Sequence, residues 1–339
     1  MSAATATASQ ADIASRPLVS ILLIAYRQAD TVGDALRGAL AQTYQPLEIL
    51  ASDDASGDGT WEALCEAAAG YAGPHHLALN RNEHNLGIGA HLSLLAQRAQ
   101  GELLFVAAGD DVSLPQRVER VVEAWLAHER RPDLIASALA DLDAEGRVHG
   151  EIVPSDLAAY TSLAQWAAQP PHVVGAAQAW TKRLVDRFGP LPPGTVAEDL
   201  VMVFRALGSG GAITLREPLV QYRRGGISRR RRKLYASDVI ERLLKNNRHA
   251  LVETEQMLKD ARLMGRYDEI GTHLERTLAR ERFIAALFGA GSAFEKLGIA
   301  LRAGEQPLAL RLRLLTYAAA PWLLAPFFAL KRLAAKERG

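Results

Sequence analysis

Residues 105–115 read FVAAGDDVSLP, and this stretch decides the predicted fold. Its apolar start predicts a buried strand, and Pro115 opens a helix in which apolar residues recur at helical spacing. Gly109, Asp110 and Asp111 therefore stand at the carboxyl end of a strand. Ligands bind at that edge of an open α/β sheet, and two adjacent carboxylates there suit a hard divalent cation that shares its shell with substrate phosphates. The alternative is a purely structural turn, because Asp, Gly and Ser commonly join a strand to a helix.

Strands and helices alternate through the whole region before this stretch. Apolar runs predict strands at residues 19–25, 47–52, 75–79 and 103–107, with amphipathic helices between them. Such alternation predicts an α/β fold with a doubly wound, mostly parallel sheet. A second acid pair, Asp53 and Asp54, follows the second of these strands and so falls at the same edge.

After residue 133 the pattern loosens. We predict strands at residues 134–139, 148–153 and 173–180 and a short helix at 163–168. A third acid pair, Glu198 and Asp199, then opens a helix. Acids in a first turn simply complement the helix dipole, which could be their whole role. As chemistry, a carboxylate at the mouth of the same sheet could act as a general base.

Composition sets limits on the class of protein. The chain has 339 residues, 49% hydrophobic and 23% charged, with a net charge of +1, which is typical of a globular protein and offers no overall positive field for nucleic acid. A single cysteine, Cys65, excludes an internal disulfide and fits a reducing compartment. Residues 1–16 lack the basic flank and apolar centre of a signal peptide, so we expect a disordered lead-in and a cytoplasmic protein.

The C-terminal third is predicted to be helical. Residues 314–330 carry no charge, contain two prolines and are bracketed by basic residues. As one helix this run would measure roughly 25 Å, short of the roughly 30 Å of a bilayer's hydrocarbon. It is therefore expected to lie in a membrane interface rather than cross it. The alternative is a helix docked on the protein's own core.

Together, the order of these motifs resembles family 2 glycosyltransferases of the GT-A fold over residues 19–228. Segment 24–27 (IAYR) resembles the end of the family's opening strand, and 53–60 (DDASGDGT) is close to its Asp-Asp-Gly-Ser-x-Asp-x-Thr motif. Segments 85–87 (NLG), 109–115 (GDDVSLP) and 198–199 (ED) match its later landmarks in order. The resemblance implies a GT-A domain with a Rossmann-like nucleotide-binding half, followed by an α-helical extension.

The resemblance also implies roles for individual residues. Tyr26 would stack on the nucleotide base, and Asp54 would accept a hydrogen bond from the base's N–H. Asp110 would be the principal ligand of a divalent cation, Mn²⁺ or Mg²⁺. The remaining donor-binding positions would be Ala25, Asn85, Gly109, Asp111 and Arg223. Asp199 and Glu198 would be the catalytic pair, with Asp199 as the base that deprotonates the acceptor hydroxyl.

Two departures from the family pattern bear on the metal. The first acid of the family's Asp-x-Asp motif aligns with Ala108, which puts the usual ribose contact in doubt. Segment 221–228 (QYRRGGIS) resembles a closing motif that normally contains a histidine, and none is present. Water or the arginine cluster of residues 223–233 would then complete the neutralisation of the diphosphate.

The resulting prediction is an inverting, metal-dependent hexosyltransferase-type glycosyltransferase. It would use a nucleotide-diphosphate sugar and a saccharide or lipid-linked acceptor in cell-envelope polysaccharide biosynthesis, at the cytoplasmic face of the membrane. We expect a lead-in at 1–16, the GT-A domain at 17–233, a helical extension at 234–306 and a segment for peripheral membrane contact at 307–339. Two alternatives stay open: a sugar-phosphate nucleotidyltransferase, and a GT-A module that binds its ligand without catalysis.

Overall fold

The computed structural model describes residues 15–143, 146–223, 235–324 and 326. Most of the expected lead-in and residues 224–233 of the closing motif and the arginine cluster lie outside these residues. Of the uncharged C-terminal run 314–330, residues 325 and 327–330 lie outside them. The chain divides into two compact units, Met1–Ser228 and Arg229–Gly339. Each unit is described separately below.

The first unit is built on one sheet. Within the described residues the strand order is β3-β2-β1-β4-β8-β6-β9-β5, with β7 paired to β6. The strands are β1 Val19–Ala25, β2 Leu47–Asp53, β3 His76–Arg81, β4 Leu103–Ala108, β5 Val112–Ser113, β6 Leu134–Leu142, β7 Val148–Ile152, β8 Gln178–Thr181 and β9 Ala212–Arg223. The first four pair in parallel, as expected, while β8 joins β4 to β6 by antiparallel pairing on both sides. The predicted α/β fold class with a doubly wound sheet is thus confirmed, with a parallel first half and a mixed second half.

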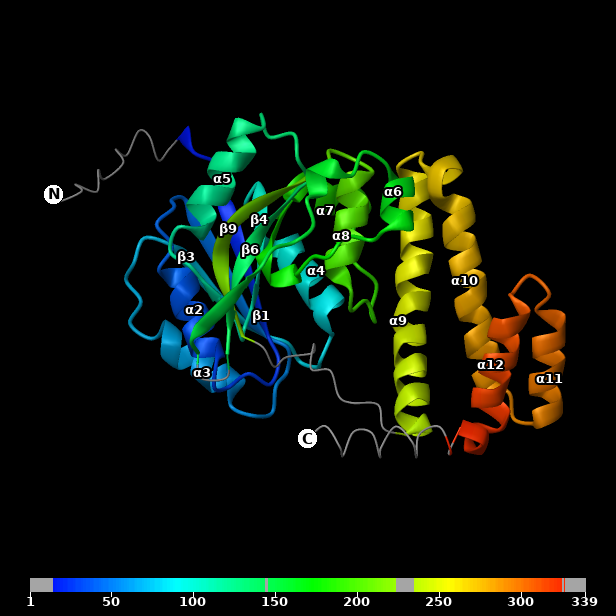
Figure 1. The fold of residues 1–339 in the computed structure, drawn as a ribbon. Helices are drawn as coiled ribbons and strands as arrows, with labels where there is room; N and C mark the ends of the chain where they lie inside the picture. Colours follow the sequence, from blue (N-terminus) through cyan, green and yellow to red (C-terminus); the bar gives the residue numbers. More distant parts are fainter. Residues whose placement is uncertain (1–14, 144–145, 224–234, 325, 327–339) are drawn as a thin grey trace. The chain divides into compact units, whose positions relative to one another are not determined.

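Helices cover both faces of this sheet (Figure 1). They are α2 Val32–Leu40, α3 Thr60–Ala68, α4 Ile88–Arg98, α5 Arg117–Ala127, α6 Leu163–Ala168, α7 Lys182–Phe188 and α8 Glu198–Leu207, with 3-10 turns η1 Leu157–Ala159 and η2 Gly175–Ala177. Figure 1 shows α2, α3 and α5 on one side of the sheet and α4, α7 and α8 on the other. This is the doubly wound arrangement that the alternation of strands and helices predicts.

The main core lies between β1, β2, β4 and the helices α2 and α5. All seven residues of β2 and six of the seven in β1 are buried, as their continuous apolar runs require of strands covered on both faces. The valines and tryptophan of α5 pack into the same cluster as Val32, Ala35 and Leu36 of α2. This core fixes the strand ends that carry the acid pairs.

One predicted strand is wrong in its extent. We expected a strand over residues 173–180, but only Gln178–Thr181 is extended, and Gly175–Ala177 forms a 3-10 turn. The reason lies in packing at Gly175. A Cβ there would stand 2.5 Å from Glu198 Oε1, so the backbone turns against the start of α8 instead of running on in the sheet.

The second unit is helical. It contains α9 Ala236–Leu263, α10 Tyr267–Gly289, α11 Ala293–Arg302, α12 Leu308–Ala319 and the turn η3 Pro321–Leu324. Its core joins the end of α10 to α11 and α12 through Phe283, Ile284, Leu287, Ala300 and Leu314. No helix in the described ranges is both long enough and apolar enough to span a bilayer.

Candidate active site

Three strand ends meet at the carboxyl edge of the parallel half-sheet. In register, Ala25 lies opposite Asp53 on one side, and Ile24 lies opposite Ala108 on the other. The chain continues this pairing past the strands, because Asp54 N donates to Ala25 O and Gly109 N donates to Ile24 O, both over 2.9 Å. Three of the predicted donor-binding positions, Ala25, Asp54 and Gly109, are thereby brought side by side.

The Asp54 carboxylate holds the loop that enters α4. It is buried, and its Oδ1 accepts hydrogen bonds from Asn82 Nδ2 at 2.8 Å and Leu86 N at 2.9 Å, while its Oδ2 accepts one from Gly87 N at 2.9 Å. The side chain of Asn85 donates to the Asp54 carbonyl at 3.3 Å. Asp54 and Asn85 thus lie together as expected. The predicted contact of Asp54 with a base remains a prediction, because both of its oxygens already bind within the chain.

Tyr26 offers an accessible ring at the same edge. Its side chain is 41% exposed, and the guanidinium of Arg27 lies 5.1 Å from the ring centroid. Arg27 has a positive φ of 54°, which turns the chain sharply after β1, and its N–H donates to Ser56 Oγ. An exposed aromatic face held beside a turn is a suitable stacking surface for a planar base.

Asp110 and Asp111 follow β4 in a tight turn, in which Asp111 N donates to Ala108 O. Burial, together with the charge of neighbouring Asp110, raises the pKa of Asp111 to about 8. Burial also raises the pKa of Asp110. The charge of Arg223 and hydrogen bonds from the Asp110 backbone N–H and the Gln28 side chain act in the opposite direction and lower it. Two carboxylates that repel each other in a buried site would be stabilised by a cation placed between them.

Gln28 is a site residue that the sequence did not reveal. Its side chain is hydrogen-bonded to Asp110, and its Oε1 accepts from Tyr26 N at 3.2 Å. A Cβ on Gly109 would meet that same Oε1 at 2.5 Å, so only glycine fits between Gln28 and the acids. Gln28 lies two residues beyond β1, where nothing in the spacing distinguishes it from an ordinary loop glutamine.

Arg223, at the end of β9, lies at the acid pair as predicted. Its backbone N–H donates to Asp111 Oδ1 at 2.9 Å, and its Nη2 donates to Asp34 Oδ2 at 2.7 Å. Asp34 was not foreseen, although it stands in the first turn of α2, directly after β1. The charge of Arg223 opposes the upward shift of the pKa at both Asp110 and Asp111.

A fully buried arginine lies behind the acids. Arg117 donates from Nη1 to Ser113 Oγ and from Nη2 to the carbonyls of Val106 and Gln178, at 2.9, 2.9 and 3.3 Å. Burial lowers its pKa to about 10, while the charge of Asp111 acts in the opposite direction. The sequence contained a signal for it, since Arg117 precedes Val121 by four residues and so lies on the apolar face of α5.

Glu198 and Asp199 open α8, as expected. Glu198 is buried against Gly175, and Asp199 is partly exposed with its Oδ1 accepting from Leu200 N at 2.8 Å. The side chain of Gln178 donates to the Asp199 carbonyl at 3.3 Å. Gln178 therefore contacts Arg117 through its own carbonyl and Asp199 through its amide. This buried residue lies between the Asp110–Asp111 and Glu198–Asp199 pairs, and no sequence pattern predicted it.

The donor set limits how a cation could bind. Among the described residues, no three Asp, Glu, His or Cys side chains gather into a metal site. Asp110 and Asp111 alone fit a hard cation that takes the rest of its shell from water and diphosphate oxygens, as Mg²⁺ commonly does. Their buried, mutually repelling carboxylates are the observation that favours this fit.

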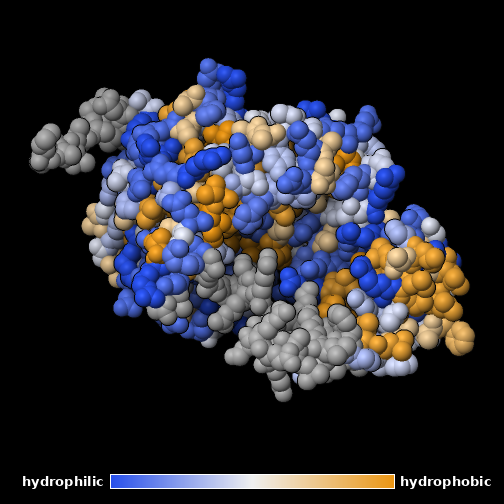
Figure 2. All heavy atoms as spheres, in the orientation of Figure 1, coloured by the Kyte–Doolittle hydropathy of each residue, from blue (hydrophilic) through white to orange (hydrophobic). Residues whose placement is uncertain are grey.

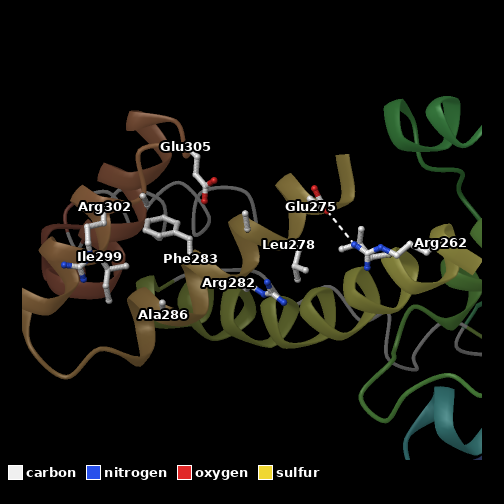
Figure 3. Close-up of a pocket in the computed structure, with 12 residues that line it drawn as sticks. Arg262, Glu275, Leu278, Arg282, Phe283, Ala286, Ile299, Arg302 and Glu305 are labelled. Carbon is white, nitrogen blue, oxygen red and sulfur yellow. Dashed lines mark ion pairs between the residues drawn. The ribbon is translucent and has the colours of Figure 1, made fainter. Parts of the chain in front are cut away.

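A pocket of about 740 Å³ lies in the second unit, between α9, α10 and α11 (Figure 3). Its lining includes the apolar side chains of Leu278, Phe283 and Ile299. Two arginines of the lining have carboxylate partners: Arg262 lies 3.7 Å from Glu275, and Arg282 lies 2.9 Å from Glu255. The lining contains no acid pair comparable with those of the first unit.

Known proteins share both the sequence and the fold of the first unit. Residues 20–134 match the family model described as Glycosyl transferase family 2. The putative glycosyltransferase EpsE of Bacillus subtilis is 30% identical over 141 residues, which cover 42% of this chain and 50% of that protein. The succinoglycan biosynthesis protein ExoO of Rhizobium meliloti is 36% identical over 112 residues, covering 32% and 29%. The chain thus spans about half or less of these curated relatives.

Two solved structures share the fold at low sequence identity. S. aureus TarS 1–349 gives a TM-score of 0.53 at 14% identity, covering 85% of this chain and 73% of that one. The mannosyltransferase PcManGT of Pyrobaculum calidifontis, solved with GDP-Man and Mn²⁺, gives 0.50 at 19% identity, covering 92% and 88%. The fold is therefore the GT-A fold of these glycosyltransferase structures. Residues 20–134 therefore carry the sequence signature of glycosyltransferase family 2.

Proposed function

We propose that this protein is an inverting glycosyltransferase that moves a sugar from a nucleoside-diphosphate donor to a hydroxyl of a saccharide or lipid-linked acceptor. The observation that carries the proposal is the position of the Asp110–Asp111 pair. It lies at the same sheet edge as Asp54 and is linked through Arg117 and Gln178 to Asp199. The proposal is supported by the fact that the proposed donor-binding residues and the candidate base belong to one compact unit.

The donor site in this proposal is the edge formed by β1, β2 and β4. Tyr26 stacks on the base, Asp54 and Asn85 shape the loop beside it, and Ala25 and Gly109 allow the nucleotide to approach the backbone closely. Asp111 and Arg223 face the ribose and diphosphate. Two structures with the same fold were solved in complex with a nucleotide sugar, TarS with UDP-GlcNAc and PcManGT with GDP-Man, which supports a nucleotide sugar as donor.

Asp110 is the proposed principal ligand of Mn²⁺ or Mg²⁺, with Asp111 in support. When bound, such a cation would stabilise the negative charge that grows on the departing nucleoside diphosphate. Gln28 and Arg223 hold the two carboxylates in place. The complex of PcManGT with Mn²⁺ supports this part of the proposal.

The chemical step is a single displacement. Asp199 takes the proton of the acceptor hydroxyl while that oxygen forms a bond to the anomeric carbon. The bond from this carbon to the diphosphate oxygen breaks, and the electron pair leaves with the nucleoside diphosphate. Attack opposite the leaving group inverts the anomeric configuration. Glu198, buried beside Asp199, fixes the start of α8 against Gly175.

The two alternatives receive less support. A nucleotidyltransferase would need a glycine-rich, basic loop after β1 to hold a triphosphate, and residues 26–30 contain no glycine. A non-catalytic module would rest on Ala108 and the missing histidine alone. The presence of Asp54, Asp110 and Asp199 in one unit argues against it.

The cellular role follows by analogy with the relatives. ExoO is named for succinoglycan biosynthesis, and WfaP of Escherichia coli is named a glucosyltransferase acting on a diphosphoundecaprenol-linked sugar. We place this protein in cell-envelope polysaccharide biosynthesis at the cytoplasmic membrane face. The domain limits 17–233, 234–306 and 307–339 belong to the same proposal.

A panel of nucleotide sugars tests the activity. The purified chain is mixed with each donor, with and without Mn²⁺ or Mg²⁺, and thermal stabilisation and slow donor hydrolysis are measured. We expect one nucleotide sugar to raise the unfolding temperature only with metal present. Stabilisation by nucleoside triphosphates with sugar phosphates, and by no nucleotide sugar, would favour the nucleotidyltransferase instead.

A further inference from the structure

The α11–α12 hairpin has apolar residues on two opposite sides. One side packs on α10, where Ala300 and Leu314 are buried. The other side carries Phe294, Leu297 and Leu301 of α11, which are exposed by 88%, 45% and 68%. These three are spaced i, i+3 and i+7 and therefore share one face of the helix. A helix that only packs on its own protein needs a single apolar side.

The exposed face continues beyond α11. Large hydrophobic residues are also exposed along α12 and η3, namely Leu308, Leu312, Trp322 and Leu323. Seven of the thirteen exposed large hydrophobics in the described part of the chain thus fall between residues 294 and 323. Figure 2 shows hydrophobic residues gathered over these two helices. Such a concentration marks an interaction surface rather than scattered exposure.

The hairpin is held together so that both helices present this face at once. Lys296 of α11 donates to the Ala318 carbonyl at 3.0 Å, and Arg311 of α12 donates to the Ala300 carbonyl at 3.1 Å. Ser292 and Glu295 form a capping box that fixes the start of α11. The face is therefore a preformed surface.

The charges around the face have mainly one sign. Residues 293–324 contain four Lys or Arg and two Asp or Glu. Arg302 and Arg313 are exposed. The two acids, Glu295 and Glu305, are exposed as well, and Glu295 is engaged in the capping box. The sequence beyond η3 stays uncharged to residue 330 and then turns basic. An apolar face with exposed arginines is complementary to an anionic lipid leaflet, whereas a second copy would bring like charges together.

We infer that the face formed by Phe294, Leu297, Leu301, Leu308, Leu312, Trp322 and Leu323 inserts into the interface of an anionic membrane, with Arg302 and Arg313 at the headgroups. Helices of ten and twelve residues measure about 15 and 18 Å, so they suit insertion parallel to the surface. This inference deepens the membrane position in the proposed function. It moves much of the contact to α11, outside the segment 307–339 expected from sequence.

Vesicle binding tests the inference on the full chain. Binding is measured by co-sedimentation with vesicles of phosphatidylglycerol and phosphatidylcholine and, separately, of phosphatidylcholine alone. We expect the triple variant Phe294→Ser, Leu297→Ser, Leu301→Ser to bind the anionic vesicles roughly tenfold or more weakly. The matched control, Leu126→Ser, Val148→Ser, Val153→Ser, removes three exposed hydrophobics of the first unit and should bind like the parent. Equal binding by the triple variant and the parent would overturn the inference.

Two further measurements test the contribution of the arginines and the insertion of Trp322 into the acyl chains. Arg302→Gln with Arg313→Gln should weaken binding to the anionic vesicles and leave the weak binding to phosphatidylcholine unchanged. Brominated acyl chains should quench Trp322, and Trp322→Phe should abolish most of that quenching. Of the other tryptophans, Trp125, Trp166 and Trp180 are buried, and Trp61 is partly buried against the core of the first unit. Absence of quenching in bound protein, or a dimer in vesicle-free solution that the triple variant dissociates, would contradict membrane insertion.

Donor hydrolysis separates this inference from the proposed activity. The triple variant should keep the parent's unfolding temperature and rate of metal-dependent donor hydrolysis. If the parent binds vesicles through this face yet hydrolyses no nucleotide sugar, the proposed activity fails and the membrane inference stands. If the variant hydrolyses donor and still binds vesicles fully, the membrane inference fails and the proposed activity stands.

Discussion

The backbone N–H of Arg223 donates a 2.9 Å hydrogen bond to Asp111 Oδ1. This bond joins the last residue of β9 to the second acid after β4, two positions 112 residues apart in sequence. The acid pair is thus shaped by both halves of the sheet. Because the donor is a backbone group, a substitution of the Arg223 side chain removes its pairing with Asp34 and leaves this bond in place.

Replacing Asp110 by Asn should abolish turnover and strongly weaken metal-dependent binding of the nucleoside diphosphate, because a neutral amide is a poor ligand for a hard cation. Titration calorimetry with Mn²⁺ and UDP or GDP measures the effect. Asp30→Asn, an exposed acid in the same loop region, serves as the control and should bind normally. Near-parental activity of Asp110→Asn at low metal concentration would exclude Asp110 as the ligand.

Replacing Asp199 by Asn should lower kcat by roughly 10²–10⁴, the usual cost of losing a positioned general base. Donor affinity should change little, because asparagine can still accept the hydrogen bond from Leu200 N. Steady-state kinetics with the donor identified by the panel provide kcat and KM. A parallel loss of donor affinity would assign Asp199 a binding role instead.

Metal binding should depend on pH. Asp111 has a raised pKa of about 8, so in the metal-free protein it is protonated at neutral pH, and a cation must displace that proton. Affinity for Mn²⁺ should therefore fall by up to about tenfold per pH unit below 8 and level off above it. The folded, metal-free protein also keeps this proton up to a higher pH than the unfolded chain does. Its free energy of unfolding should therefore fall as pH rises towards 8. Calorimetry in buffers of different ionisation enthalpy counts the released proton; no release at pH 7 would contradict this assignment.

Replacing Arg117 by Met should destabilise the fold by roughly 2–4 kcal/mol, because three buried oxygen acceptors lose their donor. The Asp111 pKa should also rise further, since the charge of Arg117 lowers it. Urea unfolding and the pH midpoint of metal binding report the two effects separately. Arg120→Met, on the exposed side of the same helix, should change neither. A stable variant with an unmoved pH midpoint would show that Arg117 does not act on Asp111.

Sequence patterns predicted those parts of the site that depend on strand ends. The apolar runs of β1, β2 and β4 place Ala25, Asp54 and Asp110 at one edge, because parallel strands that start together also end together. Gln28, Asp34 and Gln178 escaped prediction. Each makes a side-chain contact with a residue that is distant in sequence or that lies across a turn. An isolated polar residue of this kind carries no periodic signal in the sequence.

The error at residues 173–180 has a similar origin. The run VVGAAQAW has the apolar character of a strand, but the space beside Gly175 is filled by Glu198, more than twenty residues later in the chain. Local pattern therefore predicted the apolar burial of this run correctly and its backbone conformation wrongly. The strand forms only from Gln178, where the run reaches the sheet between β4 and β6.

The position of β8 has a consequence for how the chain is made. Its four residues pair with β4 on one side and with β6 on the other, yet they are translated some seventy residues after β4. Until they leave the ribosome, the inner edges of both strands stay unpaired and open to other chains. Residues 20–134, the part that carries the family signature, should therefore aggregate when expressed alone, and a workable minimal fragment must extend at least through Thr181.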